Sequence, residues 1–328
     1  MGNDASVTVK KMPDVLRIGR LEPTYEEELS ARYEIAELPG GPARASFLTE
    51  HGADIRVVLT SAPPLGIDAH TIAALPNLEM IVNYGAGVDA IDLEAAEKRG
   101  IGVSNTPDVL TDSVADTALG LILMTLRGFG AADRYARAGR WASEGRFSYG
   151  RDLSGLQVGI LGLGRIGSAI ATRLLGFDCA IAYHNRHPIA GSPYRYCSSA
   201  LELAESVDVL VIATTGDPKA RNLVDRAVLE ALGPEGYVIN IARGSVIDQD
   251  VLIELLAAGG LGGAGLDVYV DEPNVPAALR DLDNVVLFPH IGSATVRTRR
   301  AMALLAIQNL EKYLNTGELV TPVLRPRS

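Results

Sequence analysis

The stretch "LQVGILGLGRIG", residues 156–167, constrains the fold more than any other part of the sequence. An apolar segment leads into glycines at 162, 164 and 167, in G-x-G-x-x-G spacing, and a helix-periodic apolar segment follows. This order suits a dinucleotide: Gly162 permits a tight turn, Gly164 lets the backbone approach a pyrophosphate, and Gly167 allows close packing of helix and strand. A glycine-rich turn without a ligand is the alternative. We predict a dinucleotide-binding unit.

Short apolar segments alternate with helical ones along the rest of the chain. Before the motif, strands are expected at 14–19, 55–60, 78–83 and 102–105, and a second alternating series begins at the motif. That second series contains about six strands, the number typical of a doubly wound unit. A long apolar helix is expected at 111–129 and a closing helix at 295–317. Strands separated by helices indicate parallel sheets with helices on their faces.

The predicted fold class is therefore α/β, with two doubly wound parallel-sheet domains. A Rossmann dinucleotide-binding domain, residues 106–289, is inserted into a smaller flavodoxin-like substrate domain, residues 1–105 and 290–328. The crossings between them are expected at 105–107 and 289–293, where the alternation of strands and helices is interrupted.

The composition excludes several classes of protein. A formal net charge of −10 argues against a general nucleic-acid binder, which needs a basic face. No uninterrupted apolar run reaches the roughly 18 residues of a membrane span, and the first residues lack the apolar segment of a secretory signal. The two cysteines, Cys179 and Cys197, are too few for a disulfide framework or a metal site. We expect a cytoplasmic protein that uses no metal and binds neither nucleic acid nor membrane.

The turn "HNRH", residues 184–187, follows the second strand of the predicted nucleotide domain. NAD sites commonly place an acidic residue there, which accepts a hydrogen bond from the ribose 2′-hydroxyl. This chain has Asn185 and Arg186 instead. Arg186 can bind a 2′-phosphate through two hydrogen bonds, and Asn185 can add a neutral donor. NADP(H) is therefore the predicted cofactor, with NAD(H) the weaker alternative if the turn is only solvated.

Polar side chains follow three later strands of the same domain. Arg243 ends the segment "VINIAR", Asp267 and Glu272 follow "GAGL", and His290 ends "VVLFPH". The carboxyl ends of parallel strands meet at one edge of a sheet, so these side chains could converge on one site. Each of them alone also fits a structural role, as a helix-flanking charge, a turn residue or a loop histidine.

With these residues in view, the sequence closely resembles the D-isomer-specific 2-hydroxyacid dehydrogenase family. The segments that carry the resemblance span nearly the whole chain: "NYGAGVDAID", "SNTPDVLTDSVADTALGLIL", "GILGLGRIG", "INIARGSVID", "GLDVYVDEP" and "PHIGSAT". The resemblance implies an active site between the two domains, a homodimer, and Arg243, Glu272 and His290 as the catalytic set.

The resemblance also implies which residues contact the ligands. Backbone amides around Ala86 and Gly87 would hold the substrate carboxylate, Asp267 would lie near the nicotinamide, and Thr111 would lie near the cofactor phosphates. The predicted cofactor contacts are Gly162, Gly164, Arg165, Ile166, Gly167, Asn185, Arg186, Thr111, Thr214, Asp267 and Gly292. The predicted substrate contacts are Tyr84, Ala86, Gly87, Trp141, Arg243 and His290. Around Thr214 the segment 213–221 departs from the pattern of many relatives, so single roles there are left open.

The only tryptophan, Trp141, lies in the segment "GRWASEGRF". Some glyoxylate/hydroxypyruvate reductases of the family project a tryptophan at this place from the partner subunit into the substrate site. The alternative is an anchor in the dimer interface without substrate contact.

The chemistry of the catalytic set is coherent without the family. Reduction of a 2-keto acid needs a hydride on the carbonyl carbon and a proton on its oxygen. His290 is the natural proton donor, because imidazole titrates near neutral pH. Glu272 would orient it and stabilise its charged form. Arg243 would hold the substrate carboxylate and polarise the carbonyl.

We therefore expect NADPH-dependent reduction of small 2-keto acids, such as glyoxylate or hydroxypyruvate, to D-2-hydroxy acids. The chain closes at Ser328, so we expect no C-terminal regulatory domain of the kind found in longer phosphoglycerate dehydrogenases. An aryl-pyruvate or 2-ketogluconate reductase is the alternative within the family. From a different class, a non-catalytic nucleotide sensor similar to the C-terminal-binding corepressors remains open.

Overall fold

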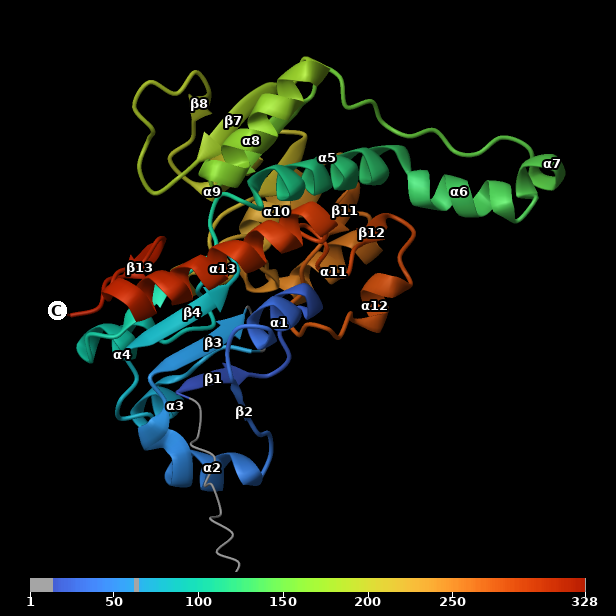
Figure 1. Ribbon diagram of the computed structural model, residues 1–328. Helices are drawn as coiled ribbons and strands as arrows, with labels where there is room; N and C mark the ends of the chain where they lie inside the picture. The colour runs from blue at the N-terminus through green and yellow to red at the C-terminus, as the bar shows by residue number, and fades with distance from the viewer. Residues whose placement is uncertain (1–13, 62–64, 328) are drawn as a thin grey trace, which may run out of the picture. The chain divides into compact units, whose positions relative to one another are not determined.

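The structure of the protein is a computed structural model that describes residues 14–61 and 65–327 (Figure 1). The N-terminal segment in which no secretory signal was expected lies outside these residues. The chain divides into two compact units. Unit 1 comprises the residues up to Pro107 and those from Arg299 onward, and unit 2 comprises Asp108–Thr298.

Unit 1 is built on a six-stranded sheet with the order β13-β5-β4-β3-β1-β2. Its strands are β1 (Val15–Ile18), β2 (Ala36–Leu38), β3 (Val57–Ser61), β4 (Met80–Tyr84), β5 (Gly102–Ser104) and β13 (Pro322–Leu324). Its helices are α1 (Pro23–Ser30), α2 (Ala43–His51), α3 (Ala69–Ala73), α4 (Leu93–Lys98) and α13 (Val296–Thr316), whose first residues belong to unit 2. All pairings are parallel except that of β13 with β5.

The central strands of unit 1 are apolar on both faces. In β3 and β4, neighbouring residues such as Val57 and Val58, or Met80 and Ile81, are all fully buried. A parallel strand covered by helices on both sides requires this, whereas a half-exposed strand would alternate. The continuous apolar runs in the sequence therefore predict these strands correctly.

Unit 2 is built on a seven-stranded parallel sheet with the order β12-β11-β10-β9-β6-β7-β8. Its strands are β6 (Gln157–Leu161), β7 (Ala180–His184), β8 (Arg195–Tyr196), β9 (Val209–Ile212), β10 (Tyr237–Asn240), β11 (Gly263–Leu266) and β12 (Val285–Leu287). The strand order reverses between β6 and β9, the place where doubly wound sheets bind ligands. The predicted fold class is confirmed, with an antiparallel edge strand added in unit 1.

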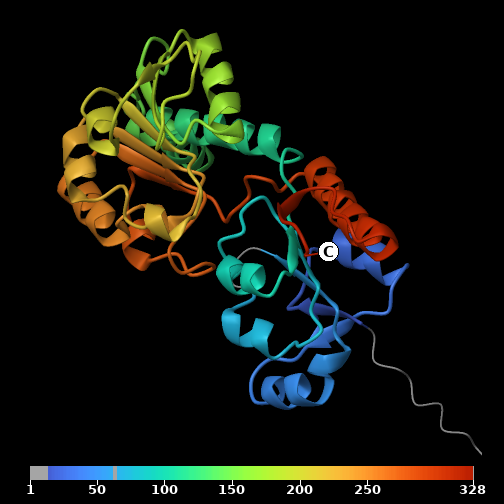
Figure 2. The same ribbon diagram turned by 90° about the vertical axis from the view of Figure 1, so that its left-hand side faces the viewer.

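Helices cover both faces of this sheet, as Figure 2 shows. The helices of unit 2 are α5 (Thr111–Arg127), α6 (Phe129–Arg137), α7 (Arg140–Glu144), α8 (Arg165–Leu174), α9 (Ala200–Ala204), α10 (Arg226–Leu232), α11 (Gln249–Ala258) and α12 (Ala277–Arg280). Helices α5 and α8 pack against each other on one face, and α9, α10 and α11 share a core with the strands on the other. Short 3-10 turns lie at Gly52–Asp54, Leu175–Phe177, Pro218–Ala220 and Gly244–Val246.

The long apolar helix expected at 111–129 is α5, which ends at Arg127, two residues earlier than expected. Gly128 has a left-handed backbone with φ of 61°, so it ends α5 and begins α6. The axes of the two helices differ by 64°.

The second crossing lies later in the chain than the sequence indicated. We expected the return to the outer domain at residue 290, whereas the units divide between Thr298 and Arg299. The cause is hydrogen bonding within unit 2: the amide of His290 donates to the carbonyl of Asp267 at 3.0 Å, and the amide of Gly292 donates to its carboxylate at 2.8 Å. The segment after β12 is thereby tied to β11.

Two further observations concern membranes and metals. Among the described residues, no single helix has the length and apolarity to cross a bilayer, although α5 and α6 taken together satisfy those criteria across their bend. In the same residues, no three His, Cys, Asp or Glu side chains gather as a metal site would need.

Two glycine-to-alanine substitutions in this region should have opposite effects. Gly120 lies inside α5 with no atom within 4 Å of an added Cβ, so Gly120→Ala should stabilise the protein by ~0.5–1 kcal/mol. Gly128 needs its left-handed backbone, so Gly128→Ala should destabilise it by ~1–2 kcal/mol. Thermal unfolding midpoints of the two variants and the wild type would measure both effects, and shifts of the same sign would contradict this account.

Candidate active site

In the loop between β6 and α8, each glycine of the motif has a different structural reason. Gly162 has φ of 101°, and an added Cβ would lie 2.6 Å from the backbone of Thr214. At Gly167 it would lie 2.3 Å from the carbonyl oxygen of Gly162. At Gly164 nothing lies within 4 Å, so the backbone is open on that side. Turn, close packing and open approach are the three features that a pyrophosphate site requires.

The N-terminus of α8 fits an anion. Gly164 caps the helix and offers no side-chain acceptor, so the first amides, at Arg165 and Ile166, have no partner within the helix. Such amides, together with the helix dipole, favour a phosphate. The guanidinium of Arg165 forms an exposed ion pair with Asp108, with Nε and Oδ1 2.7 Å apart. The loop and helix therefore fit the pyrophosphate of a dinucleotide.

Asn185, expected at the cofactor, binds the glycine loop itself. Its Oδ1 accepts a hydrogen bond from the amide of Leu163 at 2.7 Å, and its Nδ2 donates to the carbonyl of Leu163 at 3.4 Å. Leu163 is the residue between the first two glycines of the motif. Asn185 thus holds the glycine loop in shape, because its neutral amide both accepts from and donates to the backbone of Leu163.

Arg186, one residue further on, is exposed. Within the part of the chain that the structure describes, no hydrogen bond or ion pair holds its guanidinium. The preceding His184 is half-buried and is paired through Nδ1 with the carbonyl of Cys197 at 2.9 Å. Arg186 is therefore the side chain in this turn that is available to bind a 2′-phosphate through two hydrogen bonds of its guanidinium.

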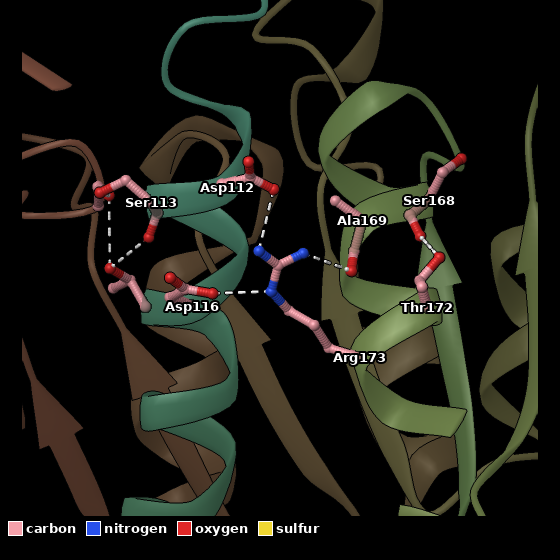
Figure 3. A network of polar contacts seen from close by, with 9 residues as sticks. Asp112, Ser113, Asp116, Ser168, Ala169, Thr172 and Arg173 are labelled. Atoms are coloured by element: carbon pink, nitrogen blue, oxygen red, sulfur yellow. Dashed lines mark hydrogen bonds and ion pairs between the residues drawn. The ribbon is translucent and has the colours of Figure 1, made fainter. Parts of the chain in front are cut away.

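Helix α5 is fastened to α8 by one arginine. The guanidinium of Arg173, on α8, lies 2.7 Å from the carboxylate of Asp116 and 2.9 Å from that of Asp112, both on α5 (Figure 3). Directly before Asp112, Thr111 begins α5, and this residue was expected to lie near the cofactor phosphates. Also on α5, the hydroxyl of Ser113 donates to the carbonyl of Gly292 at 2.9 Å. The phosphate-binding helix and the loop after β12 are thus joined through α5.

Asp267 positions the loop that carries His290. Its carboxylate is 2% exposed and accepts hydrogen bonds from the amides of Ile291 at 2.7 Å and Gly292 at 2.8 Å. A Cβ on Gly292 would lie 3.0 Å from this carboxylate, which explains the glycine. Burial raises the pKa of Asp267, while the two amides and the charge of His290 act in the opposite direction. Asp267 and Gly292, both expected at the cofactor, therefore serve to shape this loop.

His290 and Glu272 form a close pair. Nδ1 of His290 lies 2.6 Å from Oε2 of Glu272, and Oε1 of Glu272 accepts from the amide of Tyr269 at 3.0 Å. Burial alone would raise the pKa of Glu272, but the hydrogen bond and charge of His290, the Tyr269 amide and the charge of Arg243 outweigh it and lower the pKa. Glu272 is therefore ionised, and an ionised carboxylate makes Nδ1 the donor in the pair.

Arg243 follows β10, Glu272 follows β11 and His290 follows β12, and these three strands are neighbours in the sheet. The half-buried guanidinium of Arg243 donates to the carbonyl of Ala242 at 2.8 Å. The next residue, Gly244, packs directly on Tyr269, since an added Cβ would lie 1.9 Å from that residue's carbonyl carbon. The sheet therefore brings the predicted catalytic set to one edge, as the sequence indicated.

The predicted substrate contacts in unit 1 differ in how far they are exposed to solvent. Ala86 and Gly87 lie in a partly exposed loop after β4. Tyr84, in contrast, is buried, stacks on Tyr25 with ring centroids 5.0 Å apart, and donates through its hydroxyl to the carbonyl of Arg299 at 3.2 Å. Its side chain therefore packs in the core of unit 1, and its contact with substrate stays a prediction.

Trp141 lies on α7, and 71% of its surface is exposed. Figure 1 shows α6 and α7 beyond the end of α5, away from the sheet of unit 2. Phe129 and Tyr149, before and after them, are 45% and 90% exposed. Three large apolar side chains on one projecting segment indicate a surface that meets another molecule.

The geometry of unit 2 defines a class of protein: a dinucleotide-dependent oxidoreductase with an acid–base histidine. The family model "D-isomer specific 2-hydroxyacid dehydrogenase, NAD binding domain" matches residues 119–292. A glyoxylate/hydroxypyruvate reductase A from Arabidopsis thaliana is 44% identical over 310 residues, 94% of this chain and 98% of that protein. A hydroxyphenylpyruvate reductase from Plectranthus scutellarioides is 45% identical over 302 residues, 92% and 96% of the two chains.

Among solved structures, an NADPH-dependent glyoxylate/hydroxypyruvate reductase from Sinorhizobium meliloti, in complex with NADP and malonate, is similar with a TM-score of 0.90. It is 42% identical and the match covers 96% of this chain and 99% of that one. The chain therefore belongs to the D-isomer-specific 2-hydroxyacid dehydrogenase family, and it is an enzyme of the oxidoreductase class. The resemblance indicated by the sequence motifs is confirmed.

The hydrogen bonds of Asp267 predict how its replacement by asparagine changes stability and kcat. In Asp267→Asn one oxygen becomes an NH2 group that faces a backbone amide, so we expect a loss of ~1–3 kcal/mol in stability for the broken hydrogen bond. The displaced His290 should lower kcat as well. Asp208, whose Oδ2 accepts from the amide of Gln157 at 2.8 Å at the opposite end of β6, provides the control. Asp208→Asn should lower the unfolding midpoint without lowering kcat. An unchanged kcat in Asp267→Asn would refute the positioning role.

Proposed function

We propose that this protein reduces small 2-keto acids to D-2-hydroxy acids with NADPH. The observation that carries the proposal is the His290–Glu272 pair, 2.6 Å apart, in the same unit as the dinucleotide loop. The D configuration of the product follows from family membership.

His290 delivers the proton to the substrate. Its Nδ1 is committed to Glu272, and the described residues offer no partner for Nε2. Nε2 is thus the atom that protonates the carbonyl oxygen, and the carboxylate of Glu272 stabilises the imidazolium beforehand. In the reverse direction the same nitrogen accepts the proton of the hydroxy acid.

Arg243 supplies positive charge to the substrate. A guanidinium can bind a carboxylate through two hydrogen bonds and can also stabilise the negative charge that develops on the carbonyl oxygen. Bound NADPH would supply the hydride to the carbonyl carbon, so that hydride and proton together convert the ketone to an alcohol. The amides of the loop at Ala86 and Gly87 hold the substrate carboxylate.

The preference for NADPH is supported by the turn after β7. It contains no carboxylate that would repel a 2′-phosphate, and it presents the exposed guanidinium of Arg186. The similar enzyme from Sinorhizobium meliloti is NADPH-dependent and was solved with NADP.

The substrate is best identified by initial rates with both cofactors on glyoxylate, hydroxypyruvate, hydroxyphenylpyruvate and 2-ketogluconate. We expect the highest kcat/KM with NADPH and glyoxylate or hydroxypyruvate. The similar plant hydroxyphenylpyruvate reductase makes an aryl-pyruvate the second candidate. Absence of turnover with every pair would refute the proposed function and favour nucleotide sensing.

Removal of the proton donor should slow the chemical step. His290→Ala should reduce kcat by roughly 10²–10⁴-fold, the usual contribution of general acid catalysis. Because the side chain is partly exposed, the fold should tolerate the change, which circular dichroism would check. A kcat near that of the wild type would show that another group donates the proton.

Removal of the guanidinium at the cofactor turn should separate the two cofactors. A hydrogen bond to a charged group contributes ~1.5–3 kcal/mol, so Arg186→Ala should raise KM for NADPH by roughly 10-fold to 100-fold. KM for NADH, which has no 2′-phosphate, should change little. Steady-state kinetics with each cofactor measure this, and equal increases would mean that Arg186 does not contact the 2′-phosphate.

The protein is further proposed to form a homodimer through α6, α7 and the segment that follows. The exposed Phe129, Trp141 and Tyr149 support this, since large apolar patches of monomers are uncommon. Sedimentation should give twice the chain mass of 34.7 kDa. If Trp141 anchors the interface, Trp141→Ala should weaken the dimer; if it contacts substrate, the dimer should persist while KM for the keto acid rises.

A further inference from the structure

The loop after β4, residues 85–87, is held by two asparagine side chains that the sequence analysis did not single out. Nδ2 of Asn83 donates to the carbonyl of Gly85 at 3.1 Å and to that of Gly87 at 2.8 Å. Nδ2 of Asn105 donates to the carbonyl of Ala86 at 2.7 Å. Three consecutive carbonyl oxygens are therefore bound by side-chain amides of the same unit.

This arrangement determines where the backbone amides point. In a trans peptide the carbonyl of one residue and the N–H of the next are directed to opposite sides of the chain. Each N–H group of residues 86, 87 and 88 therefore points away from the asparagine that binds the preceding carbonyl: Asn83 for residues 86 and 88, and Asn105 for residue 87. Within the described residues, none of these three N–H groups has a hydrogen-bond acceptor.

The loop bends at residues 85 and 86, and successive N–H groups of such a turn can form a concave anion site when no acceptor of the chain binds them. We infer that Asn83 and Asn105 are positioning residues, which turn the amides of Ala86, Gly87 and Val88 toward the carboxylate of the 2-keto acid. The inference rests on the proposed function, since it concerns how this enzyme binds its substrate.

A cost in stability favours this role over a purely structural one. Asn83 is 1% exposed, and its Oδ1 is buried without any hydrogen-bond partner. An unpaired buried acceptor destabilises a protein and calls for an explanation. Asn83 leaves its acceptor unpaired and places both of its donors on the loop. The reverse orientation of the amide would set Oδ1 against two carbonyl oxygens, so the donors are assigned by the contacts themselves.

The positions of the two asparagines explain why they act together. Asn83 lies within β4 and Asn105 directly follows β5, and these strands are neighbours in the sheet of unit 1. The amide of Thr106 donates to the carbonyl of Gly85 as well, at 2.9 Å. The ends of both strands thus hold the loop, and the loss of either side chain should release part of it.

The test uses the variants Asn83→Ala, Asn105→Ala and Asn105→Asp, with Asn77→Ala as the matched control. Asn77 also donates from Nδ2 to a backbone carbonyl of unit 1, that of Ala53 at 2.7 Å, but it precedes β4 at the opposite end of the strand. Asn105→Asp keeps the shape of the side chain and, when ionised, removes the donor. It separates hydrogen bonding from packing, and it keeps the test valid if Asn83→Ala fails to fold.

We expect KM for glyoxylate to rise about 10-fold or more in the three loop variants, as for the loss of oriented charge-assisted hydrogen bonds, with KM for NADPH within twofold of wild type. Asn77→Ala should leave both KM values unchanged even if it lowers the unfolding midpoint. Equal changes in the two KM values, a comparable effect of Asn77→Ala, or an unchanged KM for glyoxylate in folded Asn105→Ala would overturn the inference.

A binding measurement separates this inference from the proposed function. Malonate, a dicarboxylate that cannot be reduced, is titrated calorimetrically into wild type and variants loaded with NADP. The dissociation constant should rise about 10-fold in the loop variants, whether or not any keto acid is turned over. If wild type fails to turn over the substrate panel but the malonate difference persists, only the proposed function is refuted. If malonate binds all variants equally, the positioning role is refuted.

Discussion

The catalytic edge of unit 2 depends on one buried carboxylate. Asp267 follows β11 and accepts the amides of Ile291 and Gly292, which follow β12. These hydrogen bonds hold the loop in which His290 adopts a left-handed backbone, with φ of 54°. Such a conformation is uncommon for a residue with a side chain and needs support from its surroundings. The ring is thereby placed against Glu272, and the pair can act as an acid and its orienting base.

Neutral amide side chains shape both loops that we propose to bind ligands. Asn185 satisfies the donor and the acceptor of Leu163 in the glycine loop. Asn83 and Asn105 bind the carbonyls of residues 85–87. In each case a carboxylate of the same shape could not donate to a carbonyl and would bring negative charge close to an anionic ligand. Amides therefore suit loops whose backbone N–H groups receive a phosphate or a carboxylate.

Much of the fold could be predicted from the sequence, whereas the contacts that hold the candidate site could not. Continuous apolar runs located the buried strands, and the glycine spacing located the phosphate loop. Arg243, Glu272 and His290 were candidates because strand ends of a parallel sheet share an edge, and the family resemblance identified them as a catalytic set. Tyr84, Asn185 and Asp267 were predicted to contact ligands, and in the structure their polar atoms bind the backbone of their own unit. A polar residue near a site can hold the site or touch its ligand, and sequence spacing does not distinguish the two.

The sequence by itself determined the α/β class, the dinucleotide loop and the residues of the proton-transfer pair, because periodicity and glycine spacing are local properties of the chain. Only the tertiary structure decided which atoms form hydrogen bonds with those residues. The attachment of the 290–292 loop to unit 2 and the hydrogen bond from Asn105 to the 85–87 loop both join segments distant in the chain. Such contacts form only when neighbouring strands bring their ends together, and no local pattern encodes them.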